Sequence, residues 1–137
     1  MKVIIDLEHT LSNANHRLHL LKDCKYDAFN NEFVRDPINK DVHCFAKSLR
    51  KEGHKIIILS AKRIRYSEKV RTWLHGHAVE FDQLIMRADN DKRGIVEFKT
   101  SYAIEYKKDI LIALDDVGEI CKAFCDIGIP CLRIAQR

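Results

Sequence analysis

No stretch of this sequence is apolar for long enough to cross a membrane. The longest apolar runs, such as residues 56–59 and 110–114, have the length of a β-strand, whereas a transmembrane helix needs about 20 apolar residues in succession. A positively charged start followed by an apolar segment, which would mark a signal peptide, is also missing. These absences predict a soluble protein that stays in the cytoplasm.

Cysteines in a redox or metal-binding spacing are missing too. The five cysteines are an odd number and form no C-x-x-C motif. Cys121 and Cys125 are one turn apart on an expected helix, so free, mostly buried thiols are the expected state. Low-complexity segments, internal repeats and linkers are absent, and 137 residues is the length of one domain. We therefore expect a single domain over residues 1–137.

A large excess of one charge is likewise absent. The net charge of +4 fits an anionic substrate but is too small for a nucleic-acid-binding arm. Hydrophobic residues make up 46% of the chain, enough to bury a core without disulfides or structural metals. No feature of the sequence predicts an oligomeric state.

Five short β-branched runs alternate with helical patterns. They lie at residues 2–6, 55–60, 83–86, 110–115 and 131–135. Their nearly continuous apolar character is typical of parallel strands that are covered on both faces. Between them, apolar residues recur at helical spacing, as in residues 42–49. This alternation predicts an α/β fold with a doubly wound parallel sheet of about five strands.

Residues 12–37 fall outside this rhythm. They contain two helical patterns, near residues 15–22 and 27–34. The segment is too short for an independent cap domain, so we expect a small helical flap after the first strand and no large cap. An open site of this kind would admit a macromolecular end.

Polar residues are found where the expected strands end. In doubly wound sheets, ligands bind beyond the carboxyl ends of the strands, so these residues should share one site. The residues at these ends are Asp6, Glu8, Ser60, Lys62, Arg63, Asp115 and Asp116, with Glu119 one turn further on. Lys99 opens the expected helix that precedes the fourth strand, at the same edge of the sheet. A single aspartate at a strand end is more often a turn residue or a helix cap. Four such positions at the ends of consecutive strands favour a functional site.

The chemistry of these residues is mutually consistent. Mg²⁺ in proteins is coordinated by a few carboxylates together with phosphate oxygens of the substrate. Asp6, Asp115 and Asp116 offer such carboxylates. An aspartate can also attack phosphorus to give an aspartyl-phosphate. The hydroxyl of Ser60 could hold a phosphoryl oxygen, and Lys99 could offset the charge of the carboxylates and the phosphate.

Four motifs in this chain resemble those of the haloacid dehalogenase (HAD) superfamily. The stretch "DLEHTL" resembles its D-x-D-G-T-L nucleophile loop, and "IIILSAKR" its second motif. "VEFKTS" resembles its lysine motif, and "IALDDVGE" its acidic fourth motif. All four occur in the order of the superfamily. The resemblance implies a Rossmann-like fold and a Mg²⁺-dependent phosphomonoesterase that works through an aspartyl-phosphate.

A closer resemblance covers almost the whole chain. The stretches "HRLHLL", "GHKIIILSAKR", "FDQLIMRADNDKR" and "IGIPCLRIA" are similar to the phosphatase domain of bacteriophage polynucleotide kinase-phosphatases and to small standalone proteins related to it. The implied substrate is a nucleotide or a 3′-phosphorylated nucleic acid end, and the implied location is the host cytoplasm if a phage encodes the chain. No G-x-x-x-x-G-K-[ST] loop occurs, so the kinase half of these relatives has no counterpart here.

The resemblance also implies a role for individual residues. Asp6 matches the nucleophile, Ser60 the phosphate-binding hydroxyl, and Lys99 the lysine that holds both. Asp115 and Asp116 match the metal ligands, together with Asp6 and the backbone carbonyl of Glu8, and Glu8 takes the acid/base position. For substrate binding we expect cations near the strand ends and on the flap. These are Lys62, Arg63, Arg87, His16 and Arg17, with Lys92 and Arg93 as further basic residues after the third strand. Solvated surface charge is the alternative explanation for all of them except Lys62 and Arg63.

Two positions depart from the superfamily pattern. Position 8 is usually a second aspartate and position 9 a glycine, but the chain has Glu8 and His9. Glutamate keeps the carboxylate and moves it by roughly 1 to 1.5 Å, a shift that costs about 100-fold where geometry is tight. Two hypotheses follow: an active phosphatase, or a HAD-like protein without catalysis that binds a nucleotide, a nucleic acid end or a protein.

Overall fold

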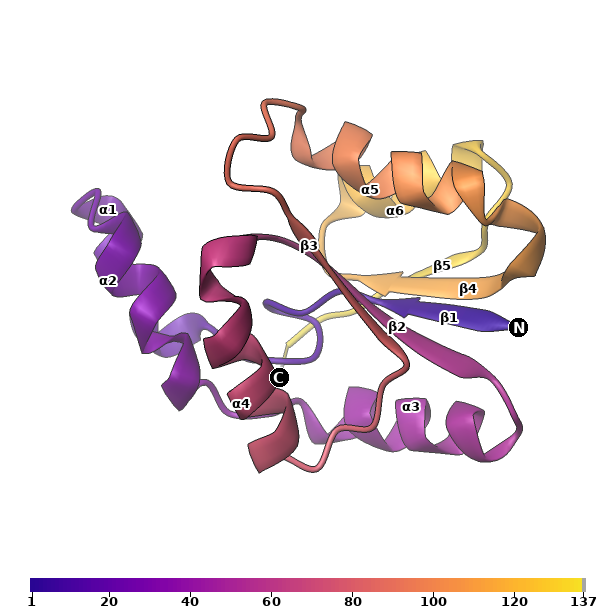
Figure 1. The fold of residues 1–137 in the computed structure, drawn as a ribbon, viewed down its shortest axis with the longest axis horizontal. Coiled ribbons are helices and arrows are strands. Elements are labelled where there is room, and N and C mark those ends of the chain that lie inside the picture. Colours follow the sequence, from indigo (N-terminus) through magenta and orange to yellow (C-terminus); the bar gives the residue numbers. More distant parts are fainter. Residues whose placement is uncertain (137) are drawn as a thin grey trace.

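The fold is built around one parallel β-sheet. The structure, a computed structural model, describes residues 1–136. Within these residues the sheet has five strands in the order β3-β2-β1-β4-β5 (Figure 1). The strands are β1 (Lys2–Ile5), β2 (Lys55–Arg63), β3 (Gln83–Arg87), β4 (Ile110–Asp115) and β5 (Cys131–Arg133). The predicted doubly wound, Rossmann-like α/β fold is therefore confirmed.

Helices cover both faces of the sheet. Figure 1 shows α3 (Lys40–Lys51) and α4 (Ser67–Gly76) on one face, and α5 (Ile95–Glu105) and α6 (Gly118–Asp126) on the other. Successive strand residues point to opposite faces. Val3 and Ile5 of β1 accordingly pack in the core under α3 and α4, whereas Ile4 packs in the core under α5 and α6. Both faces are buried, which explains why the strands are apolar throughout.

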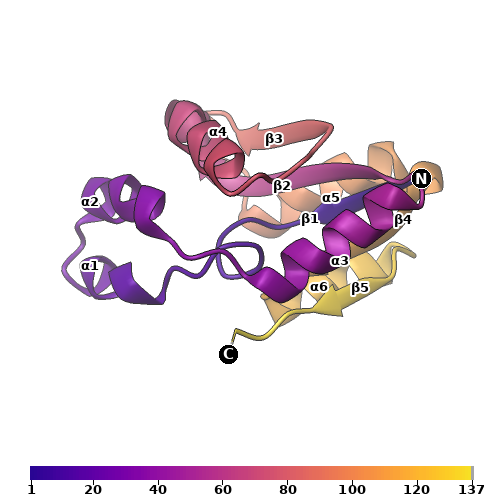
Figure 2. The same cartoon turned by 90° about the horizontal axis from the view of Figure 1, so that it is seen from below.

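Residues 12–37 form short helices that project beyond one end of the sheet (Figures 1 and 2). They are the 3-10 turns Asn15–Arg17 and Glu32–Arg35 and the helices α1 (His19–Lys22) and α2 (Tyr26–Asn31). We call residues 12–37 the flap. No large cap is present among residues 1–136, as expected from the sequence. None of the helices in this described part is long and apolar enough to span a membrane.

A buried ion pair holds the flap in place. Arg17 is fully buried, and its Nε and Nη2 donate hydrogen bonds to the two carboxylate oxygens of Asp36 at 2.8 and 2.7 Å. Its Nη1 donates to the carbonyl of Phe29 at 3.0 Å. The indole Nε1 of Trp73 in α4 donates to the carbonyl of Asp36 at 2.9 Å, which connects the flap to the sheet layers.

We expect Arg17→Ala to lower the free energy of unfolding by about 3–5 kcal/mol, because it leaves the Asp36 carboxylate buried without its cation. Arg35→Ala is the matched control. Its side chain is 75% exposed and forms an ion pair with Glu32 of the same turn, so the expected loss is below about 0.5 kcal/mol. Urea unfolding of both variants measures the difference, and equal stabilities would contradict the assigned role of Arg17.

Candidate active site

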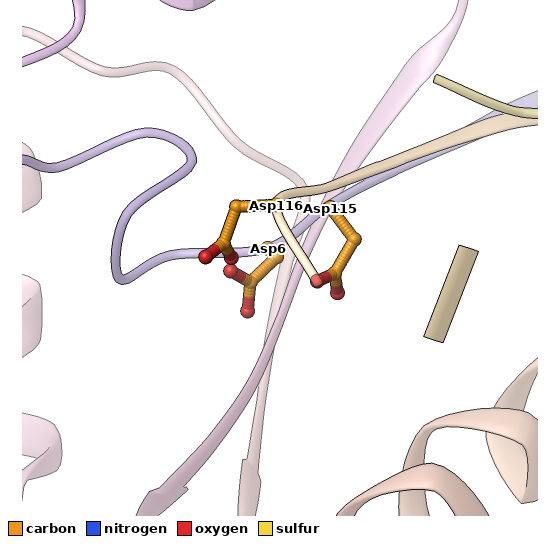
Figure 3. Close-up of side chains that lie close together, drawn as sticks. All are labelled: Asp6, Asp115 and Asp116. Atoms are coloured by element: carbon orange, nitrogen blue, oxygen red, sulfur yellow. The ribbon is translucent and has the colours of Figure 1, made fainter. Parts of the chain in front are cut away.

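Three carboxylates meet at the carboxyl ends of two adjacent strands. Asp6 directly follows β1, Asp115 ends β4, and Asp116 comes next. Because β1 and β4 pair in parallel, these ends lie at the same edge of the sheet. Figure 3 shows the three side chains gathered there, and an oxygen from each lies within 4.8 Å of the others. Opposite ligands of an octahedral Mg²⁺ ion are about 4.2 Å apart, so the donor set fits this ion after small adjustments.

Lys99 lies between two of these carboxylates. Its Nζ is 2.7 Å from Oδ1 of Asp6 and 2.5 Å from Oδ2 of Asp115. Lys99 comes from α5, whose packing against the sheet buries the side chain. Burial disfavours the charged ammonium, but the two carboxylates outweigh it and raise the pKa of Lys99 above its ordinary value. The site thus holds a permanent cation next to the expected nucleophile.

The carboxyl group of Asp6 is in an unusual electrostatic position. Burial raises its pKa to about 7 from an ordinary 3.8, Lys99 opposes this shift, and the charge of Asp115 adds to it. Thr10 contacts the carboxylate oxygen of Asp6 that Lys99 does not. Its hydroxyl lies 3.0 Å from Oδ2 of Asp6 and 3.3 Å from Oδ1 of Asp116. Sequence reasoning gave Thr10 no role, although it is the threonine of the "DLEHTL" motif.

Ser60 faces the same cavity from β2. Its side chain is buried, and its Oγ accepts a hydrogen bond from the backbone N–H of Lys62 at 3.1 Å. The cavity has a volume of about 440 Å³. Its polar lining contains Asp6, Glu8, His9, Asn30, Ser60, Lys62, Arg63, Lys99, Asp115, Asp116 and Glu119. The structure therefore brings Lys99 and the strand-end residues of the sequence prediction into one cavity.

Glu8 lines this cavity but is not one of the three clustered carboxylates. Its Oε1 accepts a hydrogen bond from Nζ of Lys62 at 2.7 Å and lies 3.6 Å from Nη2 of Arg17. The same Lys62 ammonium donates to Oδ1 of Asn30 in α2 at 2.6 Å. Burial lowers the pKa of Lys62, and the charge of Glu8 opposes that shift. Glu8 is thus held by a cation that the flap also contacts.

The loop after β1 accommodates a side chain where the superfamily has glycine. His9 adopts a φ of 65°, in the left-handed region that glycine enters without strain. The chain therefore holds a residue with a Cβ in a backbone conformation that favours glycine.

The five residues expected to bind substrate are not all at the cavity. Lys62 and Arg63 line it, and Nη1 of Arg63 also donates to the carbonyls of Ala88 and Asp91, both at 2.7 Å. His16 and Arg17 instead contact Asp36 within the flap. Arg87 is buried beside Arg63 in the register of β2 and β3, outside the lining of the cavity. Its Nε has no hydrogen-bond partner within residues 1–136.

The fold and these strand-end residues define a HAD-superfamily protein of the phosphatase type. The chain belongs to the family described as "Polynucleotide kinase PNKP phosphatase domain", whose model matches residues 1–137. A comparison with curated proteins finds no match.

Solved structures show the same relationship. A Pnkp1/Rnl/Hen1 complex contains a chain that is 28% identical, with a TM-score of 0.83, and the match covers 98% of this chain and 46% of that one. A Pnkp1/Rnl/Hen1 RNA repair complex gives 27% identity, a TM-score of 0.83, and coverage of 98% and 42%. This chain thus spans less than half of either relative. A "predicted phosphatase" from Clostridium acetobutylicum shares the fold, with 11% identity, a TM-score of 0.71, and coverage of 96% and 83%.

Proposed function

We propose that this protein is a Mg²⁺-dependent phosphomonoesterase that removes phosphate from 3′-phosphorylated nucleic acid ends or nucleotides through an aspartyl-phosphate on Asp6. The observation that carries this proposal is the contact of Asp6 with Lys99 beside Asp115 and Asp116. Residues 1–137 act as one unit in this reaction, which takes place in the cytoplasm. Membership in a polynucleotide phosphatase-domain family and the likeness to a chain of an RNA repair complex support the choice of substrate.

The nucleophile and the groups that hold the phosphate come from the end of β1, from β2 and from α5. In the first step, the Asp6 carboxylate attacks phosphorus and the bond from phosphorus to the leaving sugar oxygen breaks. The Ser60 hydroxyl and the Lys99 ammonium stabilise the negative charge of the phosphoryl oxygens in the buried cavity. Asp6, Asp115, Asp116 and the backbone carbonyl of Glu8 would hold Mg²⁺, which when bound offsets the charge of those same oxygens.

Glu8 supplies the proton transfers. Protonated Glu8 gives a proton to the leaving oxygen, and the resulting carboxylate then takes a proton from the water that hydrolyses the aspartyl-phosphate. Its hydrogen bond to Lys62 orients the longer glutamate side chain. Lys62 and Arg63, which line the cavity, provide positive charge for the phosphates of a nucleic acid.

A substrate panel tests this proposal. We expect Mg²⁺-dependent release of inorganic phosphate from 3′-phosphorylated RNA and DNA oligonucleotides, with much slower release from matched 5′-phosphorylated ones. Nucleoside monophosphates test whether a polymer is required. Removing Mg²⁺ with EDTA should lower the rate at least about 100-fold, because a bound cation contributes several kcal/mol of charge stabilisation. Absence of Mg²⁺-dependent phosphate release from every member of the panel would contradict the proposal.

A further inference from the structure

The chain beyond β5 contacts both of the loops that carry the clustered carboxylates. In Figure 1 it continues past the carboxyl ends of the strands toward the loop after β1. Nε of Arg133 donates to the carbonyl of Asp116 at 3.2 Å, and the backbone N–H of Ile134 donates to the carbonyl of Asp115 at 2.9 Å. Nε2 of Gln136 donates to the carbonyls of His9 at 2.5 Å and Thr10 at 3.3 Å. Residues 133–136 thus connect the nucleophile loop to the acidic loop.

The contact of Gln136 falls where the nucleophile loop is strained. His9 has a φ of 65°, a conformation that disfavours any residue with a Cβ and persists only when surrounding contacts enforce it. The amide of Gln136 has two N–H donors, which matches the two adjacent carbonyls. The next residue, Thr10, contacts both Asp6 and Asp116. A change in the His9 conformation would therefore move two members of the carboxylate cluster relative to each other.

We propose that Gln136 is a positioning residue that enforces the left-handed His9 conformation and thereby sets the spacing of Asp6, Asp115 and Asp116 for Mg²⁺. This inference rests on the proposed function only through its metal site. It assigns to residue 136 the conformational control that a glycine at position 9 would make unnecessary. The dependence on Gln136 should therefore disappear when position 9 is glycine.

Calorimetric titration with MgCl₂ in the absence of substrate tests this, on wild type, Gln136→Ala, His9→Gly and the double variant. We expect Gln136→Ala to weaken Mg²⁺ binding about 10-fold, in the range found when a group that supports metal ligands is removed. We expect the rate of phosphate release at limiting Mg²⁺ to fall with this affinity, whereas KM for a 3′-phosphorylated oligonucleotide, measured at saturating Mg²⁺, should stay unchanged. In the His9→Gly background, the effect of Gln136→Ala on Mg²⁺ binding should be less than about twofold. The double-mutant cycle would then show that positions 9 and 136 are coupled.

Gln83→Ala is the matched control. It removes the same kind of amide from the first residue of β3, at the edge of the sheet opposite to the carboxylates. Gln83 accepts a hydrogen bond there from the Tyr102 hydroxyl at 3.1 Å, and its loss should leave Mg²⁺ binding unchanged. An unchanged affinity in Gln136→Ala, or an equal loss in both backgrounds, would overturn the inference. A wild type that binds Mg²⁺ with the expected dependence on Gln136 but hydrolyses nothing would support the inference and refute the proposed function. A wild type that binds no Mg²⁺ would overturn both.

Discussion

Asp6→Asn is expected to reduce phosphate release to background, a loss of at least about 1,000-fold, because an amide cannot attack phosphorus as a carboxylate does. The substitution keeps the size of the side chain. Lys99 Nζ donates to Oδ1 of Asp6 and the Thr10 hydroxyl to Oδ2. The amide oxygen of asparagine can keep the hydrogen bond from Lys99, and its amide N–H can donate to the Thr10 hydroxyl, so the site keeps its shape but loses its nucleophile. Initial rates with a 3′-phosphorylated oligonucleotide measure this effect. Asp126→Asn, at an exposed ion pair with Lys122, is the control and should retain full activity.

The same variant has a predictable effect on stability. Because burial raises the pKa of Asp6 to about 7 from 3.8, the folded state binds its proton more tightly than the unfolded state does. The stability that this provides is complete below pH of about 4 and is lost as the pH rises through about 7. Asp6→Asn lacks this titration. In metal-free buffer, thermal unfolding of wild type should therefore lose more stability between about pH 5 and 8 than that of Asp6→Asn, and parallel curves would contradict the assignment.

Glu8→Gln is expected to lower the hydrolysis rate at least about 100-fold, because the amide can neither donate the proton of a carboxylic acid nor accept one from water. Glu8→Asp is also expected to lower the rate. The Glu8 carboxylate is hydrogen-bonded to Lys62, and His9 takes the left-handed conformation, so the loop is built around the longer side chain. An aspartate at position 8 would fall short of both Lys62 and the leaving oxygen.

The outcome of these two substitutions separates the phosphatase from the binding-module hypothesis. Glu52→Gln is the matched control, since Glu52 is exposed at the end of α3, and it should be neutral. If Glu8→Asp instead raised a near-background activity, Glu8 would mark the loss of an ancestral activity. If wild type, Glu8→Asp and Glu8→Gln all had equal, near-background rates, the protein would be a binding module.

The grouping of the strand-end residues could be predicted from the sequence for one physical reason. Apolar runs and helical spacing predicted the parallel sheet, and the carboxyl ends of parallel strands lie at one edge. The positions of Asp6, Ser60 and Asp115 follow from that rule alone. Lys99 could be placed there because its helix precedes β4 and packs on the sheet. The strand bounds differ in detail: β2 continues beyond Ser60 to Arg63, and β5 ends at Arg133.

The remaining contacts could not be predicted, because they depend on how irregular segments fold back. Arg17 was expected to contact substrate, but its partner Asp36 lies 19 residues away at the other end of the flap. Asn30 reaches Lys62 only because the flap packs over the cavity. Gln136 meets His9 and Thr10 across almost the whole length of the chain. No periodicity or motif marks any of these contacts.

The central claim is that Asp6 becomes phosphorylated during turnover. The most direct measurement is acid quenching of Glu8→Gln after mixing with Mg²⁺ and an aryl phosphate that carries a radiolabelled phosphoryl group. An aryl leaving group departs without a proton from Glu8, whereas hydrolysis of the aspartyl-phosphate still needs the missing base. We expect label to accumulate on the protein, to map to the peptide that contains Asp6, and to be released by hydroxylamine. Release of phosphate with no labelled protein, or label on another residue, would contradict it.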